Sequence, residues 1–153
     1  MKILQNLRDQ GRGQDLAAVL AHIPYAEFLG LEVSQQGQEV ITVLPFAEHL
    51  IGNVTLPALH GGAVGAMLEM TAVLQLIYDT ECERLPKTID VSIDYLRSAR
   101  ATTTYGRAIV TRRGRRVANV RVELWQESRD KPVAAGHGHF LLSPLKESVD
   151  QTN

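Results

Sequence analysis

The sequence contains one cysteine, Cys82, in 153 residues. A single cysteine excludes an internal disulfide, and it also excludes the paired-cysteine spacings that hold zinc and iron–sulfur clusters. We therefore expect a protein of a reducing compartment, because disulfide-stapled proteins belong to oxidising ones.

The sequence also lacks an apolar run long enough to cross a membrane. The longest run, from Ala63 to Tyr78, has 16 residues and is interrupted by Glu69, Thr71 and Gln75, whereas a membrane helix needs about 20 apolar residues. The first residues show neither the apolar core nor the cleavage site of a signal peptide. These absences predict a cytoplasmic protein that does not bind a membrane.

A strong net charge is absent too, since 16 basic and 17 acidic residues leave a net charge of −1. Positive charge is nevertheless concentrated locally, with eight arginines and no acidic residue between Arg97 and Arg121. Such a segment can attract a phosphate-bearing ligand, whereas a nucleic-acid-binding domain is usually basic as a whole. We expect a local anion site and no nucleic-acid partner.

The remaining composition is that of an ordinary soluble domain, with 44% hydrophobic and 22% charged residues. The length predicts one domain, which can bury about 70% of the surface of its unfolded chain. A core of this size needs no disulfide.

Hydrophobic spacing predicts the order of the secondary structure. Apolar residues recur at helical spacing in one segment and alternate with polar residues in six others. A further helix, after Gly61, is apolar on all sides, which is typical of a buried helix. We expect a helix at 15–23 that ends at Pro24, strands at 28–35 and 38–46 joined by a turn at Gly37, a loop at 47–59, the buried helix from Gly61 to before Pro86, and strands at 87–99, 103–113, 116–127 and 132–143.

This order predicts an α+β fold, in which an antiparallel sheet of about six strands wraps around one long central helix. That arrangement is the hotdog fold. We expect the domain at 25–143, after a helical lead-in at 1–24 and before a polar tail at 144–153.

Four segments between residues 25 and 142 carry a resemblance to a known family: GNVTLPALHGGAVGAMLEMTA, TIDVSIDYLRSA, RRGRRVANVRVEL and VAAGHGHFLL. In this order and spacing they resemble the hotdog-fold acyl-CoA thioesterases, in particular the PaaI-like branch of phenylacetate degradation. The resemblance implies an enzyme that hydrolyses acyl-CoA to a free acid and coenzyme A, without a metal or redox cofactor. It also implies a homodimer, or a tetramer built from dimers.

The resemblance assigns roles to four residues. The backbone N–H of Gly61 would polarise the thioester carbonyl, and Glu69, eight residues later, would be the catalytic carboxylate. Asn53 and Thr88 would orient the reactants. The chain departs from the usual family pattern in two ways, because the link after Asn53 is longer and free of glycine, and because many members carry aspartate in place of Glu69.

Physical reasoning about the same helix supports a composite site. The first N–H groups of a helix that begins at Gly61 have no intrahelical partner and lie at the positive end of the helix dipole. Glu69 has no Lys or Arg three or four residues away, so helical ion pairing does not explain it. It lies about 12 Å further along the axis at 1.5 Å per residue. Two antiparallel helices from two chains could bring the two groups together, which predicts a dimer.

Five further residues are candidates for substrate binding. His60 is expected mainly to fix the start of the helix, and Gly62 to allow close approach of the ligand. Arg97, Arg113 and Arg116 are expected to hold the phosphates of coenzyme A, since phosphate groups pair with cations. We expect His137 and His139 to be ordinary strand residues, because no third metal ligand accompanies them.

Glu69 could act either as a general base on water or as the attacking nucleophile.

Two other functions are also compatible with the sequence. A hotdog dehydratase would use His60 together with a carboxylate to move protons on an acyl thioester. A non-catalytic acyl-CoA binding protein would hold the ligand without cleaving it.

Overall fold

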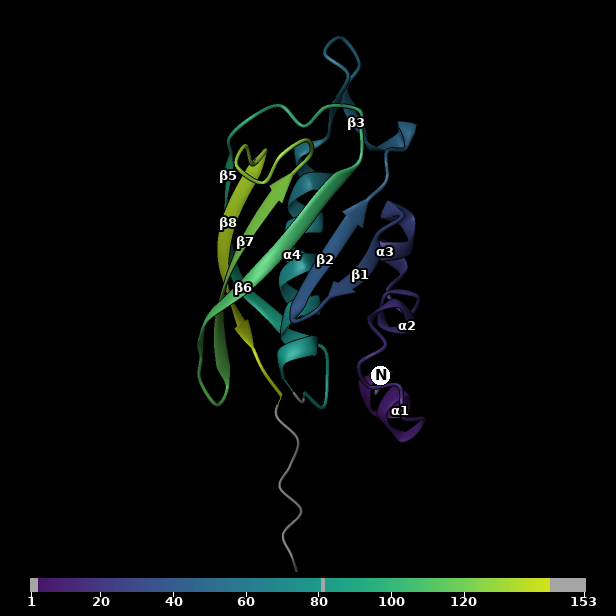
Figure 1. The fold of residues 1–153 in the computed structure, drawn as a ribbon, viewed down its shortest axis with the longest axis vertical. Coiled ribbons are helices and arrows are strands. Elements are labelled where there is room, and N and C mark those ends of the chain that lie inside the picture. Colours follow the sequence, from purple (N-terminus) through teal and green to yellow (C-terminus); the bar gives the residue numbers. More distant parts are fainter. Residues whose placement is uncertain (1–2, 81, 144–153) are drawn as a thin grey trace, which may run out of the picture.

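The computed structural model describes residues 3–80 and 82–143 as a sheet wrapped around one helix (Figure 1). The polar tail expected at 144–153 lies outside the described residues.

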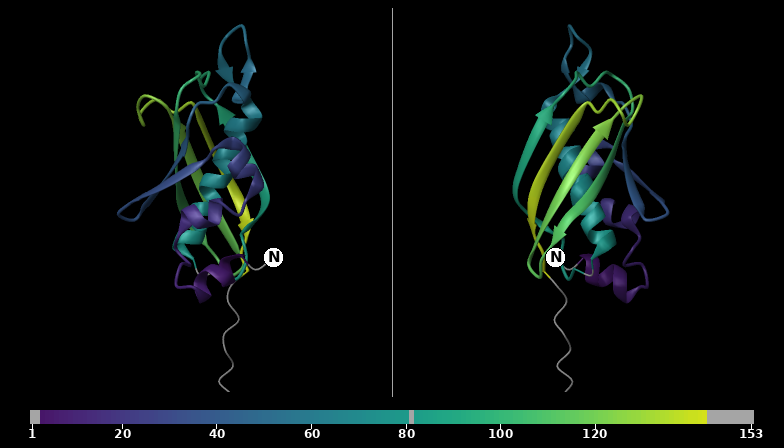
Figure 2. Two further views of the ribbon diagram at one scale, coloured as in Figure 1. Left: turned by 90° about the vertical axis from the view of Figure 1, so that its right-hand side faces the viewer. Right: turned by 60° about the vertical axis from the view of Figure 1, so that its left-hand side comes forward.

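The sheet has six antiparallel strands in the spatial order β1-β2-β6-β7-β8-β5. It curls around α4 (Gly61–Asp79), which runs along its concave side (Figures 1 and 2). This α+β hotdog arrangement confirms the fold predicted from the sequence. The strands are β1 (Glu32–Gln36), β2 (Glu39–Leu44), β5 (Lys87–Tyr95), β6 (Thr104–Arg113), β7 (Val117–Trp125) and β8 (Ala134–Leu141).

α4 forms the centre of the core. Eleven of its 19 side chains are buried, and it packs against β2, β6 and β7. It begins at Gly61 and ends at Asp79, before Pro86 as expected. By length and composition alone, α4 is long and apolar enough to cross a membrane. However, 61% of its most apolar stretch is buried inside the protein, and the core helices of soluble proteins have the same length and composition.

Two of the three polar residues that interrupt the apolar run hold α4 against β2. The hydroxyl groups of Thr71 and Thr42 lie 2.6 Å apart, and Gln75 Oε1 accepts the backbone N–H of Val40 at 3.3 Å. Gly106 leaves room for the threonine pair, since a Cβ at that position would lie 2.7 Å from Thr42 Oγ1 and 2.9 Å from Thr71 Oγ1. These buried polar groups are therefore satisfied by the sheet, as buried polar groups must be.

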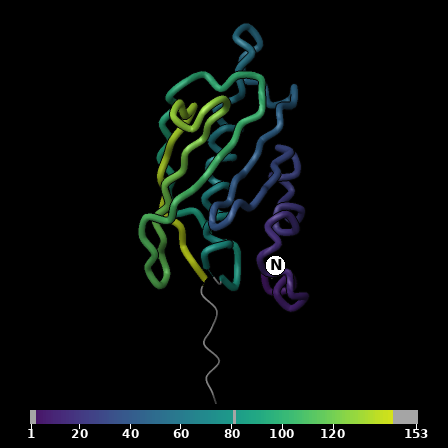
Figure 3. The backbone as a smooth tube through the Cα atoms, in the orientation of Figure 1, coloured from purple at the N-terminus to yellow at the C-terminus, as the bar shows by residue number. Residues whose placement is uncertain are grey.

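Three short helices precede the sheet and lie beside its β1 edge (Figures 1 and 3). α2 lies within the segment predicted as helical, and the Asp15 carboxylate caps it by accepting the N–H of Ala18 at 2.9 Å. α2 packs against β1 and α4, and α1 packs against α2. The helices are α1 (Ile3–Asp9), α2 (Leu16–Leu20) and α3 (Pro24–Leu29).

The start of the first strand was predicted wrongly. The alternation suggested a strand from Phe28, but Phe28 belongs to α3 and β1 begins at Glu32. Pro24 occupies the first turn of α3, where its missing N–H costs nothing. Gly30 then ends the helix in the left-handed conformation, with φ of 71°, which is the common way for a helix to stop.

The segment expected as a loop at 47–59 also contains short regular elements. A 3₁₀ helix, η1 (Glu48–Leu50), leads into β3 (Ile51–Asn53), which pairs with β4 (Ala58–Leu59) in a small separate sheet. This β3–β4 hairpin projects beyond one end of the main sheet (Figure 3). Strands of two and three residues are too short to show an alternating pattern, so the sequence could not reveal them.

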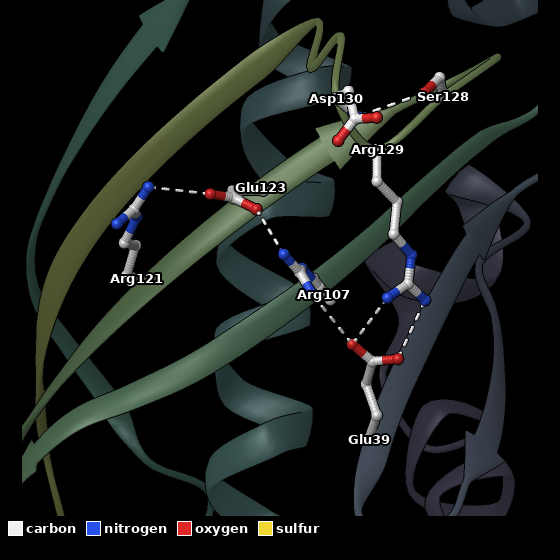
Figure 4. A network of polar contacts seen from close by, with 7 residues as sticks. All are labelled: Glu39, Arg107, Arg121, Glu123, Ser128, Arg129 and Asp130. Carbon is white, nitrogen blue, oxygen red and sulfur yellow. Dashed lines mark hydrogen bonds and ion pairs between the residues drawn. The ribbon is translucent and has the colours of Figure 1, made fainter.

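The outer face of the sheet carries a network of ion pairs (Figure 4). Glu39 accepts hydrogen bonds from Arg129 at 3.1 and 2.9 Å, and a longer one from Arg107 at 3.4 Å. Arg107 also donates to Glu123 at 3.0 Å, and Arg121 donates to Glu123 at 2.9 Å. Two of the eight arginines between 97 and 121 are thus neutralised by glutamates, which leaves fewer charges for an anionic ligand.

The network predicts an acid-dependent loss of stability. The hydrogen bond from Arg129 lowers the pKa of the Glu39 carboxyl below its ordinary value of 4.5. A carboxyl with a lowered pKa stabilises the folded state above pH 4.5, and this contribution disappears as the pH falls through the lowered value. In urea unfolding, Glu39→Gln should therefore be less stable than wild type at pH 7, and the difference should shrink below pH 4.5.

The control for this prediction is Glu32→Gln. Glu32 is an exposed strand carboxylate for which residues 3–80 and 82–143 provide no ion pair. Its substitution should leave the pH dependence unchanged. Parallel stability curves for wild type and Glu39→Gln would contradict the prediction.

Candidate active site

The first turn of α4 leaves one backbone donor free. His60 is the N-cap: its Nδ1 accepts the N–H of Gly62 at 2.8 Å, and its carbonyl accepts the N–H groups of Ala63 and Val64. The N–H of Gly61 has no hydrogen-bond partner among the described residues. Gly61 therefore presents an unpaired donor at the positive end of a 19-residue helix.

The cap also defines which tautomer His60 adopts. A ring nitrogen that accepts a hydrogen bond carries no proton, so the proton of the neutral ring is on Nε2. The structure thus places His60 at the start of the helix, in the role predicted for it. The N–H of Gly62 is occupied by this cap, so Gly62 offers no second free donor.

Tyr95 contacts the same turn and was not identified from the sequence. Its hydroxyl donates to the carbonyl oxygen of Gly61 at 2.8 Å, and its ring would lie 3.5 Å from a Cβ placed on Gly61. Tyr95 is the last residue of β5. The alternation of Val91, Ile93 and Tyr95 in the sequence put all three on one strand face, but it did not show that this face meets the start of α4.

Glu69 is half-buried on α4, and the hydroxyl of Thr88 donates to its Oε1. The structure therefore brings these two predicted residues together within one chain. A β-bulge between Thr88 and Asp90 makes this contact possible. Thr88 pairs with the buried Phe140, so its side chain faces inward, whereas Asp90 pairs with His139 and faces outward.

The sheet covers one face of α4 only in part. We call this the open face; its members are Gly61, Gly62, Gly65, Ala66, Glu69 and Met70, and none of them is buried. β5 borders it as an edge strand of the sheet. Ile89 in β5 and Leu96 directly after it are 55% and 50% exposed. The free N–H of Gly61 and the carboxylate of Glu69 share this face, about 12 Å apart along the helix axis. One chain does not bring them to a single carbonyl group.

Asn53 lies at the end of β3, in the projecting hairpin. Its Oδ1 accepts the backbone N–H groups of Thr55 at 3.0 Å and of Leu56 at 3.2 Å. The side-chain carbonyl is therefore used to form the turn, as asparagine commonly does. A role of Asn53 in orienting the substrate stays a prediction.

The predicted arginines lie at two different ends of the protein. Arg97 lines a hollow of about 400 Å³ together with Gly61, and its guanidinium donates to Pro132 O at 2.7 Å. An adjoining hollow of about 400 Å³ is lined by Arg97, Arg100 and Lys131. Sequence reasoning did not single out Arg100 or Lys131, although Arg100 lies in the basic segment.

Arg113 and Arg116 lie instead at the turn between β6 and β7. Arg113 donates to the carbonyl oxygen of Asp79, the last residue of α4, at 3.2 Å. Within one chain Arg113 is thus separated from Gly61 by the length of the helix, about 28 Å for 19 residues.

The two strand histidines do not form a metal site. Among residues 3–80 and 82–143, no three His, Cys, Asp or Glu side chains are grouped so that they could hold a metal ion. His139 Nδ1 lies 2.8 Å from Asp90 Oδ1 on the outer face of the sheet, and this hydrogen bond lowers the pKa of the Asp90 carboxyl. The polar groups of the open face are the backbone N–H of Gly61 and the carboxylate of Glu69, a pair that suits acyl transfer.

Comparison with known proteins gives consistent matches. A model of the thioesterase superfamily matches residues 56–133. The medium/long-chain acyl-CoA thioesterase YigI of Escherichia coli (strain K12) is 30% identical in an alignment of 123 positions that covers 71% of this chain and 79% of that protein. A solved structure from Chromobacterium violaceum is 36% identical with a TM-score of 0.74, and it covers 95% of this chain and 100% of its own.

A second solved structure carries the name of the predicted branch. It is a putative thioesterase from Ralstonia eutropha JMP134, described as a phenylacetic acid degradation-related protein, with 25% identity and a TM-score of 0.71 over 83% of this chain and 98% of its own. The superfamily match spans α4 and β5, and so includes Gly61, Glu69, Thr88 and Tyr95. Site geometry, sequence and fold agree that the chain belongs to the thioesterase superfamily.

Proposed function

We propose that the protein hydrolyses an acyl-coenzyme A thioester to a free acid and coenzyme A. The observation that carries the proposal is the open face of α4, where the unpaired N–H of Gly61 and the carboxylate of Glu69 lie beside an exposed strand edge. An unpaired helix-terminal N–H can stabilise the oxyanion of an acyl transfer, and a carboxylate can activate water. The likeness to the acyl-CoA thioesterase YigI supports coenzyme A as the thiol.

The site is complete only when two chains meet. Gly61 of one copy and Glu69 of another lie opposite each other when two α4 helices pack antiparallel through their open faces. The partner we propose is a second copy, because β5 is an edge strand with unpaired backbone groups, and such an edge is a template for another strand. The small residues Gly62 and Ala66 keep the facing surface of α4 low, which allows a second helix to approach closely.

The chemistry then follows from the contacts of each group. Thr88 donates to Oε1 of Glu69, which fixes the carboxylate and leaves Oε2 for a water molecule. As that water attacks the thioester carbon, Glu69 takes its proton, and the N–H of Gly61 stabilises the oxygen that becomes negative. The C–S bond then breaks, and the proton passes to the departing sulfur.

The coenzyme A end of the substrate fits the hollows beyond Gly61. They lead from Gly61 past Arg97 to Arg100 and Lys131. Arg100 pairs with Glu127 at 3.4 Å, and the three cations exceed this one acid, which suits the negative phosphates of the coenzyme. The dehydratase alternative gains no support from the geometry, because His60 Nδ1 is already committed to Gly62.

The first test of this proposed function concerns Glu69. Release of free thiol should be measured for short, medium, long and aromatic acyl-CoAs, with wild type and Glu69→Gln. The variant should lose about a hundredfold or more in kcat, the scale of a positioned base, while Glu32→Gln retains wild-type activity. If no thioester is cleaved, the binding-protein alternative replaces this proposal. If Glu69→Gln cleaves thioesters as fast as wild type, Glu69 is not the catalytic base.

A second prediction tests the hydroxyl that holds Glu69. Thr88→Val keeps the shape of the side chain but removes the donor, and kcat should fall about tenfold, the scale of a hydrogen bond to a charged group. Thr88→Ser keeps the donor and should retain most of the activity. Equal rates for Thr88→Val and wild type would show that Thr88 does not orient the carboxylate.

A third prediction separates a composite site from a site within one chain. Gly61→Pro removes the N–H, and proline is favoured at the first helical position; His60 has φ −62° and ψ 132°, a conformation compatible with a following proline. Gly61→Pro and Glu69→Gln should each be inactive alone. Mixed and reassembled in equal amounts, they should regain about a quarter of wild-type activity, because half of the dimers are mixed and each mixed dimer has one intact site of two.

The control for the mixing experiment is Gly61→Ala, which keeps the N–H and should stay active. Its Cβ would meet Tyr95 only at 3.5 Å, an ordinary contact. No recovery of activity in the mixture would mean that Gly61 and Glu69 of different chains do not share a site.

A further inference from the structure

The peptide group between Gly61 and Gly62 is held at both ends. The hydroxyl of Tyr95 donates to its carbonyl oxygen at 2.8 Å, and His60 Nδ1 accepts its N–H at 2.8 Å. The free N–H of Gly61 belongs to the peptide immediately before it. Fixing one peptide plane therefore restricts the direction in which the adjacent N–H points.

This restriction is needed because the turn starts with two glycines. Glycine has the largest conformational freedom of any residue, and the N–H groups of a helix's first turn lack the intrahelical partners that hold later turns. The cap from His60 acts only on the N–H side of the peptide. On the carbonyl side, Tyr95 adds a hydrogen bond from β5 to the one that a first-turn carbonyl accepts within the helix.

We propose that Tyr95 is a positioning residue for the oxyanion donor of Gly61, an inference that rests on the proposed thioesterase function. Tyr95 acts through the Gly61–Gly62 peptide and does not itself contact the reacting atoms. Donation to the carbonyl also polarises that peptide and strengthens the hydrogen bond from Gly62 to His60, since hydrogen bonds in a chain reinforce one another.

The surroundings of Tyr95 favour this role over packing alone. The residue is 56% exposed, so burial of its ring explains little of its presence. Its hydroxyl makes its hydrogen bond to Gly61 O and to no other group of residues 3–80 and 82–143. A Cβ on Gly65 would lie only 3.3 Å from that hydroxyl. The absence of a side chain at Gly65 therefore lets the phenol lie close to the helix backbone.

The chain contains a matched control at the other end of the same helix. The hydroxyl of Tyr78 also donates to a glycine carbonyl, that of Gly37, at 3.4 Å, and it accepts a hydrogen bond from Gln35 at 2.8 Å. Tyr78→Phe thus removes a comparable hydroxyl from α4 without affecting the turn at Gly61.

The experiment compares steady-state kinetics of wild type, Tyr95→Phe and Tyr78→Phe on the best acyl-CoA of the panel. In Tyr95→Phe, kcat should fall about five- to tenfold, the scale of one lost hydrogen bond. KM should stay unchanged, because phenylalanine keeps the ring that lines the hollow beside Arg97 and removes only the hydroxyl. Tyr78→Phe should keep wild-type kcat.

A second measurement does not depend on activity. Amide hydrogen exchange of Gly62, followed by NMR, should be faster in Tyr95→Phe than in wild type, and unchanged in Tyr78→Phe. Wild-type kcat in Tyr95→Phe, a change in KM alone, an equal loss in Tyr78→Phe, or unchanged exchange at Gly62 would each overturn the positioning role. If wild type cleaves no thioester, the proposed function fails, and the exchange of Gly62 alone decides whether Tyr95 restrains the turn.

Discussion

The burial of α4 under the curled sheet is the interaction on which the rest of the structure depends. Side chains such as Met67, Leu74 and Leu76 are fully buried, and each stabilises the fold by about 1.5–3 kcal/mol. Because these contacts fix the helix along its length, they also fix its first turn relative to β5. The backbone N–H of Gly61 is held in place by the core, although the core residues do not touch it.

Polar residues on α4 divide according to the direction in which they point. Thr71 and Gln75 face the sheet and find partners on β2, so they join two layers of the fold. Glu69 faces away from the sheet, and Thr88 is its single hydrogen-bond partner within residues 3–80 and 82–143. A carboxylate that the fold does not need for its own connections remains available for the chemistry proposed above.

The sequence predicted the helices and strands that are long enough to show a clear spacing of apolar residues. The buried helix and the four strands after it each extend over eight residues or more, so their spacing was unambiguous, and the position of Glu69 relative to Gly61 followed from helix geometry. Features that depend on short elements or on contacts between distant segments were missed. α3, the β3–β4 hairpin and the contact of Tyr95 with Gly61 belong to this group, because spacing along the chain does not tell which strand end meets which helix end.

β5 holds two groups of the candidate site and also forms an edge of the sheet. Thr88 near its beginning holds the acid, Tyr95 at its end holds the turn with the free donor, and its outer edge is unpaired. In the composite arrangement proposed above, the event that covers this edge also completes the site. A newly made, solitary subunit would then be both inactive and prone to association, so that the enzyme matures in the same step in which it is protected from wrong partners.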